Sequence, residues 1–473
     1  MKKLILSLAI LSVFACKEEK KQEETKVVTV EKVAIQPISA SDLETAVIYE
    51  ANIRQYSPEG TFEQFTKDIP QLKQLGVKVI WLMPVFPISE TKRKATGGED
   101  SKFATDFPEA EQDKYLGSYY AISDFTKINP EFGTIENFRD LVNTAHDNGI
   151  YVILDWVPNH TGWDHTWLKT NPEYYTQNDK GEVVHPVDTD WTDVADLNYD
   201  NQEMRKAMVA DMSYWLTEEG VDGFRCDVAG SVPTNFWEQA IPELRAKKDI
   251  FMLAEAWEPE LLKDGLFDMA YGWDRHHAMN VIAKGEKDAT EFTSALQTDF
   301  DRYASDDILM NFVTNHDENS WNGTIKERMG DASKMMTALA YVTPGMPLIY
   351  SGQEYDLDHR LLFFEKDSFP HIKGTTWKLL EKLATLKQNN AALHGGKASA
   401  KYNAIDNGKD VISFSRTKDN DEVVFIANVS KENTKVNLVQ KGTYLDYLSN
   451  KTIELEGDAI PLAVNEFKIL VKK

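Results

Sequence analysis

The sequence has few cysteines, an excess of acidic over basic residues, and no apolar run long enough to cross a membrane as a mature helix. Its two cysteines, Cys16 and Cys226, exclude a disulfide-stapled scaffold. The 52 Lys and Arg are outnumbered by 76 Asp and Glu, and the net charge of −24 argues against nucleic acid or an anionic membrane surface as a partner. No internal repeat is present. The 473 residues, 42% of them hydrophobic, predict a globular protein with more than one core.

The amino terminus has the pattern of a targeting segment. Lys2 and Lys3 precede an apolar run over residues 4–14, which is followed by Ala15 and Cys16. Residues 13–16 (Val-Phe-Ala-Cys) resemble a bacterial lipobox, in which the signal is cut before the cysteine and the cysteine is lipidated. The resemblance implies a signal peptide over 1–15, lipidation at Cys16, and an exported protein held by lipid at the outer membrane, on the cell surface or the periplasmic face. An ordinary secretory signal with an incidental cysteine is the alternative.

Residues 16–44 begin with a charged run, Lys-Glu-Glu-Lys-Lys-Gln-Glu-Glu after Cys16, that contains almost no apolar side chains. Such a composition cannot bury enough surface to fold, so we expect a disordered tether between the anchor and the globular part.

Several strand-like runs end on acidic residues. The pentapeptide 223–227 (Gly-Phe-Arg-Cys-Asp) ends on Asp227, and the runs 151–155, 251–255 and 309–317 end on Asp155, Glu255 and Asp317. An eight-fold β/α barrel uses roughly 30 residues per unit, so Asp227 to Glu255 is one unit and Glu255 to Asp317 is two. The interval from Asp155 to Asp227 is longer by about 40 residues, which predicts an insertion. Acids at successive strand ends would meet at one mouth of a barrel, as paired-carboxylate glycoside hydrolysis requires.

Four segments carry a specific resemblance. Residues 155–160 (Asp-Trp-Val-Pro-Asn-His), 223–227, 255–257 (Glu-Ala-Trp) and 312–317 (Phe-Val-Thr-Asn-His-Asp) resemble, in order, the four signature regions of the α-amylase family, glycoside hydrolase family 13. Residues 194–198 and 115–124 resemble two further regions of that family. The resemblance covers residues 45 to 473. It implies an α/β fold: a (β/α)8 TIM barrel over 45–394, a small domain B inserted after strand 3 over 159–200, and a C-terminal antiparallel β-sandwich over 395–473.

The same resemblance implies the site. Asp227 is expected to be the nucleophile, Glu255 the general acid/base and Asp317 the third catalytic carboxylate. Tyr120, His160, Arg225 and His316 fall on substrate-binding positions of the family. Independently of the family, Arg225 and Asp227 share a face if they lie on a strand, which predicts that the arginine lowers the pKa of Asp227. Cys226, between them, is expected to point into the packing outside the barrel.

The resemblance also raises the question of a metal. Asn159 and Asp196 match positions that often hold structural Ca²⁺ in the family, and their oxygens are of the type that calcium prefers. This chain has Gly230 and Ser231 where many α-amylases carry Lys-His, and that difference puts in doubt both the calcium shell and the sugar contacts beyond the scissile bond. Calcium therefore stays open. The family implies no organic cofactor.

The leading hypothesis is a retaining glycoside hydrolase that cleaves α-1,4-glucosidic bonds in starch, maltodextrin or a related α-glucan. One alternative is a transglycosylase or a neopullulanase- or cyclomaltodextrinase-like enzyme. Another, from a different class, is a non-catalytic glycan-binding lipoprotein, although this chain keeps all three acids of the family. The sequence separates neither α-1,4 from α-1,6 or cyclic substrates nor endo from exo action, and it does not indicate an oligomeric state.

Overall fold

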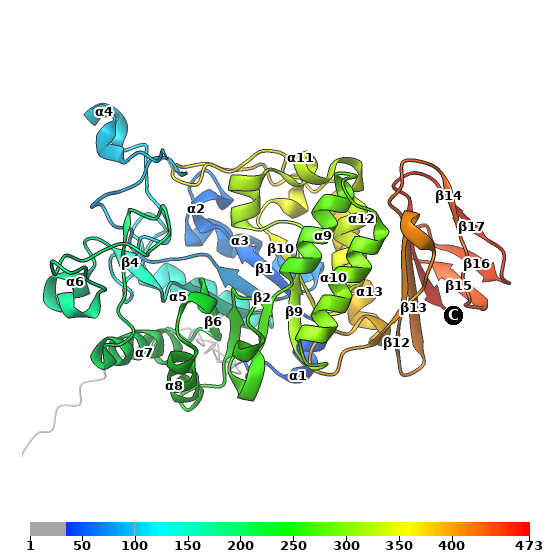
Figure 1. The fold of residues 1–473 in the computed structure, drawn as a ribbon, viewed down its shortest axis with the longest axis horizontal. Helices are drawn as coiled ribbons and strands as arrows, with labels where there is room; N and C mark the ends of the chain where they lie inside the picture. The colour runs from blue at the N-terminus through cyan, green and yellow to red at the C-terminus, as the bar shows by residue number, and fades with distance from the viewer. Residues whose placement is uncertain (1–34, 99) are drawn as a thin grey trace, which may run out of the picture. The chain divides into compact units, whose positions relative to one another are not determined.

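The computed structural model describes residues 35–98 and 100–473. The predicted signal peptide, Cys16 and residues 17–34 of the predicted tether lie outside these residues. The prediction of a disordered tether is wrong for residues 35–44, because they include most of α1 (Ala40–Thr45), whose Leu43 packs into the barrel interior. A closed barrel of parallel strands forms the centre of the described chain, in the order β1-β10-β9-β8-β7-β6-β3-β2 (Figure 1). The strands of the barrel are β1 (Val47–Ala51), β2 (Val77–Leu82), β3 (Tyr151–Trp156), β6 (Gly223–Cys226), β7 (Phe251–Ala254), β8 (Met269–Tyr271), β9 (Ile308–Asn311) and β10 (Met346–Tyr350).

Helices surround the barrel and separate its strands along the chain. The longer ones are α3 (Phe62–Leu72), α5 (Ile135–Asp147), α7 (Gln202–Thr217), α8 (Thr234–Arg245), α9 (Trp273–Ala283), α10 (Ala289–Arg302), α12 (Ser333–Val342) and α13 (Thr375–Asn389). The shorter ones are α1 (Ala40–Thr45), α2 (Ile53–Tyr56), α4 (Glu109–Gln112), α6 (Thr166–Thr170) and α11 (Ile325–Met329). Among the described residues, none of the helices is both long and apolar enough to span a membrane.

Two apolar layers hold this arrangement together. One lies inside the barrel, where side chains such as Ile48, Trp81 and Leu253 fill the interior. Helix α1 covers the amino-terminal end of the barrel through Leu43. The other lies between the strands and the helices and includes Cys226, which is fully buried there. Because neighbouring strand residues point to opposite faces, Arg225 and Asp227 face inward, and the predicted outward direction of Cys226 is confirmed.

Local sequence signals explain several element boundaries. Thr134 caps α5 by accepting a hydrogen bond from Asn137 N. Gly76 ends the helical run after α3 with φ of 74°, a conformation that glycine adopts without strain. The strand-like run over 309–317 was predicted too long, because β9 ends at Asn311. Residues 312–316 are also buried but do not pair as a strand, so burial alone made the strand look longer in the sequence.

An insertion follows β3, as the spacing predicted. It contains β4 (His160–Gly162) and β5 (Val194–Asp196), which pair antiparallel, together with α6. His160 is directly opposite Asp196 in this pair. The insertion thereby brings two ends of the segment 159–200 together next to the end of β3.

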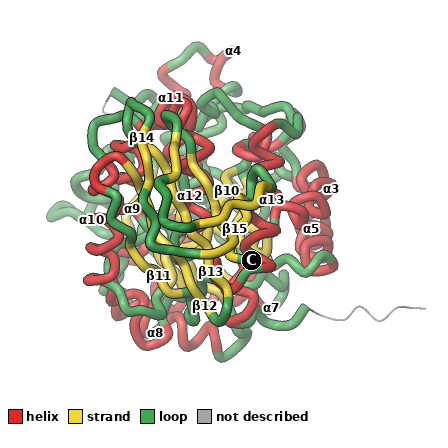
Figure 2. The backbone as a smooth tube through the Cα atoms, turned by 90° about the vertical axis from the view of Figure 1, so that its right-hand side faces the viewer, coloured by secondary structure: helices red, strands yellow, loops and turns green. Residues whose placement is uncertain are grey.

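The C-terminal strands form two antiparallel sheets. The larger has the order β11-β12-β13-β18-β15-β16, and β14 pairs with β17 in the smaller (Figure 2). Their bounds are β11 (Lys401–Ala404), β12 (Val411–Lys418), β13 (Asp421–Asn428), β14 (Thr434–Val436), β15 (Gly442–Asp446), β16 (Lys451–Leu455), β17 (Ile460–Leu462) and β18 (Phe467–Lys472). A core between the sheets includes Val424, Val436 and Leu470, and the antiparallel sandwich that the sequence predicted is confirmed.

Candidate active site

Arg225 is the centre of the predicted acidic cluster. Its Nη1 lies 2.8 Å from Asp155 Oδ1 and 2.9 Å from Asp227 Oδ1, and its Nη2 lies 2.8 Å from Glu255 Oε2. Register explains the convergence, because Asp155 pairs with Arg225 across β3 and β6, and Asp227 and Glu255 follow the last residues of β6 and β7. One fully buried guanidinium therefore holds three carboxylates at the carboxyl end of the barrel.

Backbone conformation places the two predicted reacting carboxylates. Gly223 has φ of 148°, and a Cβ there would lie 1.9 Å from Phe251 O, so only glycine lets β6 approach β7 this closely. Val228, directly after Asp227, has φ of 37° and ψ of 45°, which is costly for a β-branched residue. In this conformation Val228 N donates a hydrogen bond to Glu255 Oε2 at 2.8 Å. The turn after Asp227 thus orients Glu255.

Asp155 connects the acidic cluster to two aromatic side chains through hydrogen bonds. Its Oδ2 accepts hydrogen bonds from Trp81 Nε1 at 3.0 Å and from the Tyr120 hydroxyl at 3.1 Å. The Tyr120 hydroxyl also lies 2.8 Å from His316 Nε2, and the two rings stack at 5.5 Å. The Tyr120 hydroxyl is therefore held by two partners, which fixes the position of the ring.

His316 lies between two carboxylates. Its Nδ1 is 2.5 Å from Glu50 Oε1, and its Nε2 is 3.3 Å from Asp317 Oδ2. Burial disfavours the charged imidazole, but Asp317 and Glu50 outweigh that effect and raise the pKa of His316 to about 9. His316 is therefore a cation at neutral pH. It holds Asp317, whose side chain is 42% exposed, at the edge of the cluster.

Arg225 favours the ionised form of Asp227, as predicted, but the expected net lowering of the Asp227 pKa is wrong. Burial raises the pKa of Asp227 well above its usual range; Arg225 opposes this, and Glu255 and Asp155 add to it. The sequence showed one arginine beside one aspartate, whereas the fold gives that arginine three carboxylates to neutralise. Removing the proton from Asp227 is correspondingly harder in the ligand-free protein.

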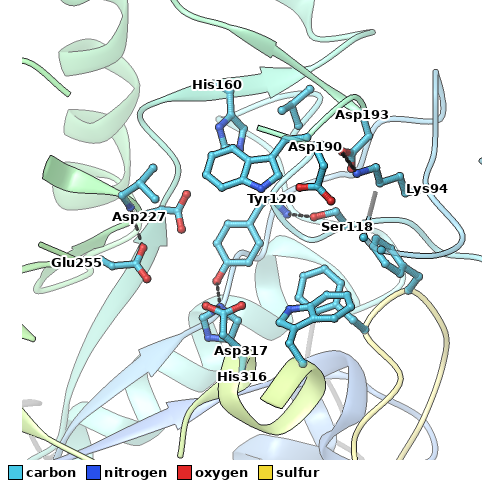
Figure 3. A pocket seen from close by; sticks show the side chains of 18 residues that line it. Lys94, Ser118, Tyr120, His160, Asp190, Asp193, Asp227, Glu255, His316 and Asp317 are labelled. Carbon is cyan, nitrogen blue, oxygen red and sulfur yellow. Dashed lines mark hydrogen bonds and ion pairs between the residues drawn. The ribbon is translucent and has the colours of Figure 1, made fainter. Parts of the chain in front are cut away.

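Asp227, Glu255, Asp317, Tyr120 and His316 line a cavity of about 520 Å³ (Figure 3). His160, from the start of β4, borders it with a ring 5.5 Å from that of Trp191, and burial lowers the pKa of His160 to about 3. This histidine is therefore neutral and can donate or accept a hydrogen bond. The lining residues are Lys94, Gly97, Gly98, Ser118, Tyr120, His160, Asp190, Trp191, Asp193, Val194, Asp227, Val228, Glu255, His316, Asp317, Trp321, Phe363 and Phe364.

All seven predicted catalytic and substrate-binding residues meet at this end of the barrel. Arg225 alone does not line the cavity, because it lies beneath the carboxylates. Sequence reasoning missed Glu50 and the wall formed by Lys94, Asp190 and Trp191. Glu50 had a usable signal, since it is an acid at the end of the first strand run, but the wall comes from loops without periodicity.

The two predicted calcium positions lie close together but offer few ligands. Asn159 Nδ2 lies 3.2 Å from His160 Nδ1, and burial raises the pKa of the Asp196 carboxyl. Calcium takes six to eight oxygens. Among the described residues, no group of three or more His, Cys, Asp and Glu is placed to hold a metal. Backbone carbonyls would have to complete a site here, so the residues present fit calcium only in part.

The Gly230-Ser231 difference has a structural counterpart. A Cβ built on Gly230 would lie 2.4 Å from Glu258 Oε2, so the Glu258 side chain occupies the space that a larger residue would take. Glu258 Oε2 accepts a hydrogen bond from Trp257 N at 3.0 Å. The chain therefore has a carboxylate near this point of the mouth.

A barrel with clustered acids at its carboxyl end is the architecture of a glycoside-processing protein. Residues 35–191 and 187–423 match the model of the α-amylase catalytic domain, and residues 402–468 match the α-amylase C-terminal all-beta domain. The chain belongs to the α-amylase family.

Individual relatives agree with this. The chain is 26% identical over 433 residues to the α-amylase MalA of Haloarcula japonica, with 88% of this chain and 60% of that protein covered. It is 24% identical to a cyclomaltodextrinase of Thermoanaerobacter pseudethanolicus, covering 87% of this chain and 71% of that one. A noncanonic maltogenic α-amylase, AmyB of Thermotoga neapolitana, has a crystal structure with a TM-score of 0.79 at 28% identity, covering 91% of this chain and 99% of that one.

Proposed function

We propose that this protein is a retaining glycoside hydrolase of α-1,4-glucans such as starch and maltodextrin. The observation that carries the proposal is the joint contact of Asp227 and Glu255 with Arg225 at the wall of a cavity. Both carboxylates are held by one rigid guanidinium, so they can act on the same bond. Membership of the α-amylase family supports the substrate class.

The reaction uses the two carboxylates in turn. Asp227 attacks the anomeric carbon while Glu255 donates a proton to the glycosidic oxygen, which leaves with the rest of the glucan. A covalent glycosyl-enzyme results. Glu255, now deprotonated, then takes a proton from a water that attacks the same carbon, and Asp227 leaves with the bonding electrons. Retention predicts a separation of about 5–5.5 Å between the two carboxyl groups.

The other residues bind the sugar at the reacting position. The Tyr120 ring stacks against it, and neutral His160 and cationic His316 hydrogen-bond its hydroxyls. Asp317 binds hydroxyls and favours the distorted ring of the transition state. Because His316 holds Asp317, the position and the charge of these two side chains are fixed before the substrate binds.

Product analysis tests this function. Purified protein is incubated with starch, maltodextrin, pullulan and cyclodextrin, and the products are resolved by chromatography. Linear maltooligosaccharides from starch, with retained anomeric configuration, are expected. Products longer than the starting oligosaccharide would favour the transglycosylase, and preferred cleavage of pullulan or cyclodextrin would favour the neopullulanase- or cyclomaltodextrinase-like alternative, as the cyclomaltodextrinase relative suggests. Binding without products would favour the glycan-binding lipoprotein.

We also propose that structural Ca²⁺ binds at Asn159 and Asp196, with backbone carbonyls completing its shell. Bound metal stabilises the native state by mass action, so EDTA should lower the Tm. Asp196→Asn should make the Tm insensitive to EDTA. An unchanged melting curve of the wild-type protein, with no metal in the preparation, would remove calcium from this account.

Export and lipidation at Cys16 are the last part of the proposal, supported by the sequence pattern of residues 1–24. Cys16→Ser should release the protein from membranes, because stable anchoring requires acyl chains. A variant that stays membrane-bound would mean that the anchor is elsewhere. Protease treatment of whole cells then separates the cell surface from the periplasmic face.

A further inference from the structure

The loop after β2 reaches across one end of the cavity and contacts domain B. Lys94 is only 4% exposed, its Nζ donates a hydrogen bond to Asp190 O at 2.5 Å, and it lies 3.7 Å from Asp193 Oδ1. Asp190 and Asp193 belong to the insertion after β3. Because both side chains are nearly buried, separating the loop from domain B would leave a buried charge without its partner.

The same loop contacts the barrel side of the cavity through Gly97. A Cβ built on Gly97 would lie 2.8 Å from Cη2 and Cζ3 of Trp321, so the glycine backbone packs directly on the indole. Trp321 in turn lies 5.0 Å from the ring of Phe363. Gly97, Trp321 and Phe363 all line the cavity, and they leave no room for a side chain between the loop and the indole.

The segment that carries Trp321 is itself held in place. Asn319 Oδ1 accepts a hydrogen bond from Leu361 N at 2.8 Å, and Asn319 Nδ2 donates one to His359 O at 3.2 Å. Residues 318–322 and 359–364 therefore form one unit. The loop 94–98 connects this unit to domain B across the cavity.

The closed end lies away from the acids. In Figure 3, Asp227 and Glu255 are on one side of the cavity, Lys94 and Asp193 are on the other, and Tyr120 is between them. Glu255 protonates the leaving oxygen, so the leaving part of the glucan extends past Glu255. The sugars on the non-reducing side must then extend from Tyr120 toward Lys94 and Trp321.

We propose that Lys94, Gly97 and Trp321 close the non-reducing end of the cleft, so that the enzyme acts on free non-reducing chain ends and releases short oligosaccharides. The inference rests on the proposed hydrolase function and specifies it. An open cleft lets a long glucan pass through in both directions, whereas a closed end admits only as many sugars as fit between Tyr120 and the wall. A substituent on the terminal sugar would collide with the wall.

Two maltoheptaosides test the closure, one with a free non-reducing end and one blocked there by a 4,6-ethylidene group. The wild-type protein should cleave the free substrate at least about tenfold faster than the blocked one, measured as kcat/KM. Trp321→Ala should bring the ratio toward one by raising the rate on the blocked substrate. Phe300→Ala is the matched control, because Phe300 is an equally exposed aromatic residue that does not line the cavity. It should leave both rates unchanged.

Equal rates of the wild-type protein on both substrates would overturn the closure. A binding measurement separates this result from failure of the hydrolase itself. In the Glu255→Gln variant, calorimetry should show at least about tenfold weaker binding of ethylidene-maltotriose than of maltotriose, and Trp321→Leu should remove the difference. If neither heptaoside is cleaved, the hydrolase proposal fails, and equal binding of the two trisaccharides, or binding of neither, overturns the closure as well.

Discussion

At the carboxyl end of the barrel a buried arginine is surrounded by carboxylates, whereas at the opposite end two buried cations are surrounded by backbone carbonyls. Arg225 contacts three acids. Lys387 Nζ donates to Leu393 O at 2.8 Å, and Arg416 donates to the carbonyls of Val342, His394 and Ala400 at 2.9–3.3 Å. All three cations are fully buried.

The two environments differ in net charge. Around Arg225 the carboxylates outnumber the cation. This is tolerable because Asp227 and Glu255 line a cavity open to water or substrate, and Asp155 accepts hydrogen bonds from Trp81 and Tyr120. Around Lys387 and Arg416 the hydrogen-bond acceptors are neutral carbonyls. The carboxylate that acts electrostatically on Lys387 is Glu44, and Glu44 itself forms an ion pair with Lys418 at 3.2 Å. The first arrangement leaves acids free to react. The second joins the barrel to the C-terminal sheet, because Arg416 belongs to β12 and Val342 to α12.

The largest expected effect is on catalysis at the acid end. Asp227→Asn and Glu255→Gln should each lower kcat on starch on the order of 10⁴-fold, because each removes a group that forms or breaks a bond in the reaction. The Tm should fall little, since each amide still fits a site crowded with carboxylates. Steady-state kinetics and thermal unfolding measure the two effects. Near-wild-type turnover of either variant would show that its residue has been given the wrong role.

The opposite end should show the reverse pattern. Arg416→Met leaves three buried carbonyls without their donor and should cost about 3 kcal/mol of unfolding free energy, with kcat/KM unchanged. Arg302→Met is the control: Arg302 is about one-third exposed and pairs with Asp274 at 2.7 Å, so its loss should cost about 0.5 kcal/mol. Urea unfolding distinguishes these values. A cost for Arg416→Met as small as that of the control would mean that the carbonyls find other partners.

How much of this comparison the sequence predicted depends on the distance along the chain. Asp227 and Arg225 are two residues apart, and four short motifs identified the acids, because strand ends in a barrel converge by geometry. Glu50 could have been found as an acid in the first strand run, but its pairing with His316, 266 residues away, could not be predicted from local sequence.

The net direction of the Asp227 pKa shift was predicted wrongly from local sequence. A single Arg–Asp pair predicts a lowered pKa for Asp227, but the register of β3, β6 and β7 adds Asp155 and Glu255 to the same guanidinium. Burial then raises the pKa of Asp227. The burial of Lys387 and Arg416 could not be predicted from the sequence either, since an isolated Lys or Arg in a helix or a strand is usually exposed to solvent.

The smallest expected effect is a difference in pH dependence between the two ends. Burial lowers the pKa of Lys387 from 10.5 to about 7, so Lys387 makes the folded state less stable as pH falls through this range. His316 has the opposite sign. Its pKa is raised from 6.5 to about 9 against burial by Asp317 and Glu50, so its stabilisation is full below pH 6.5 and is lost as pH rises through 9.

Between pH 7 and 9 the two residues should therefore change stability in opposite directions. The unfolding free energy of the wild type minus that of Lys387→Met should rise with pH, and the same difference for His316→Gln should fall, each by about 1–2 kcal/mol across this range. Lys378→Met, at an exposed position of the same helix as Lys387, is the control and should give a flat difference. Urea titrations at several pH values measure all three. Slopes of the same sign for Lys387→Met and His316→Gln would contradict the contrast between an end that holds its cations with carboxylates and an end that holds them with carbonyls.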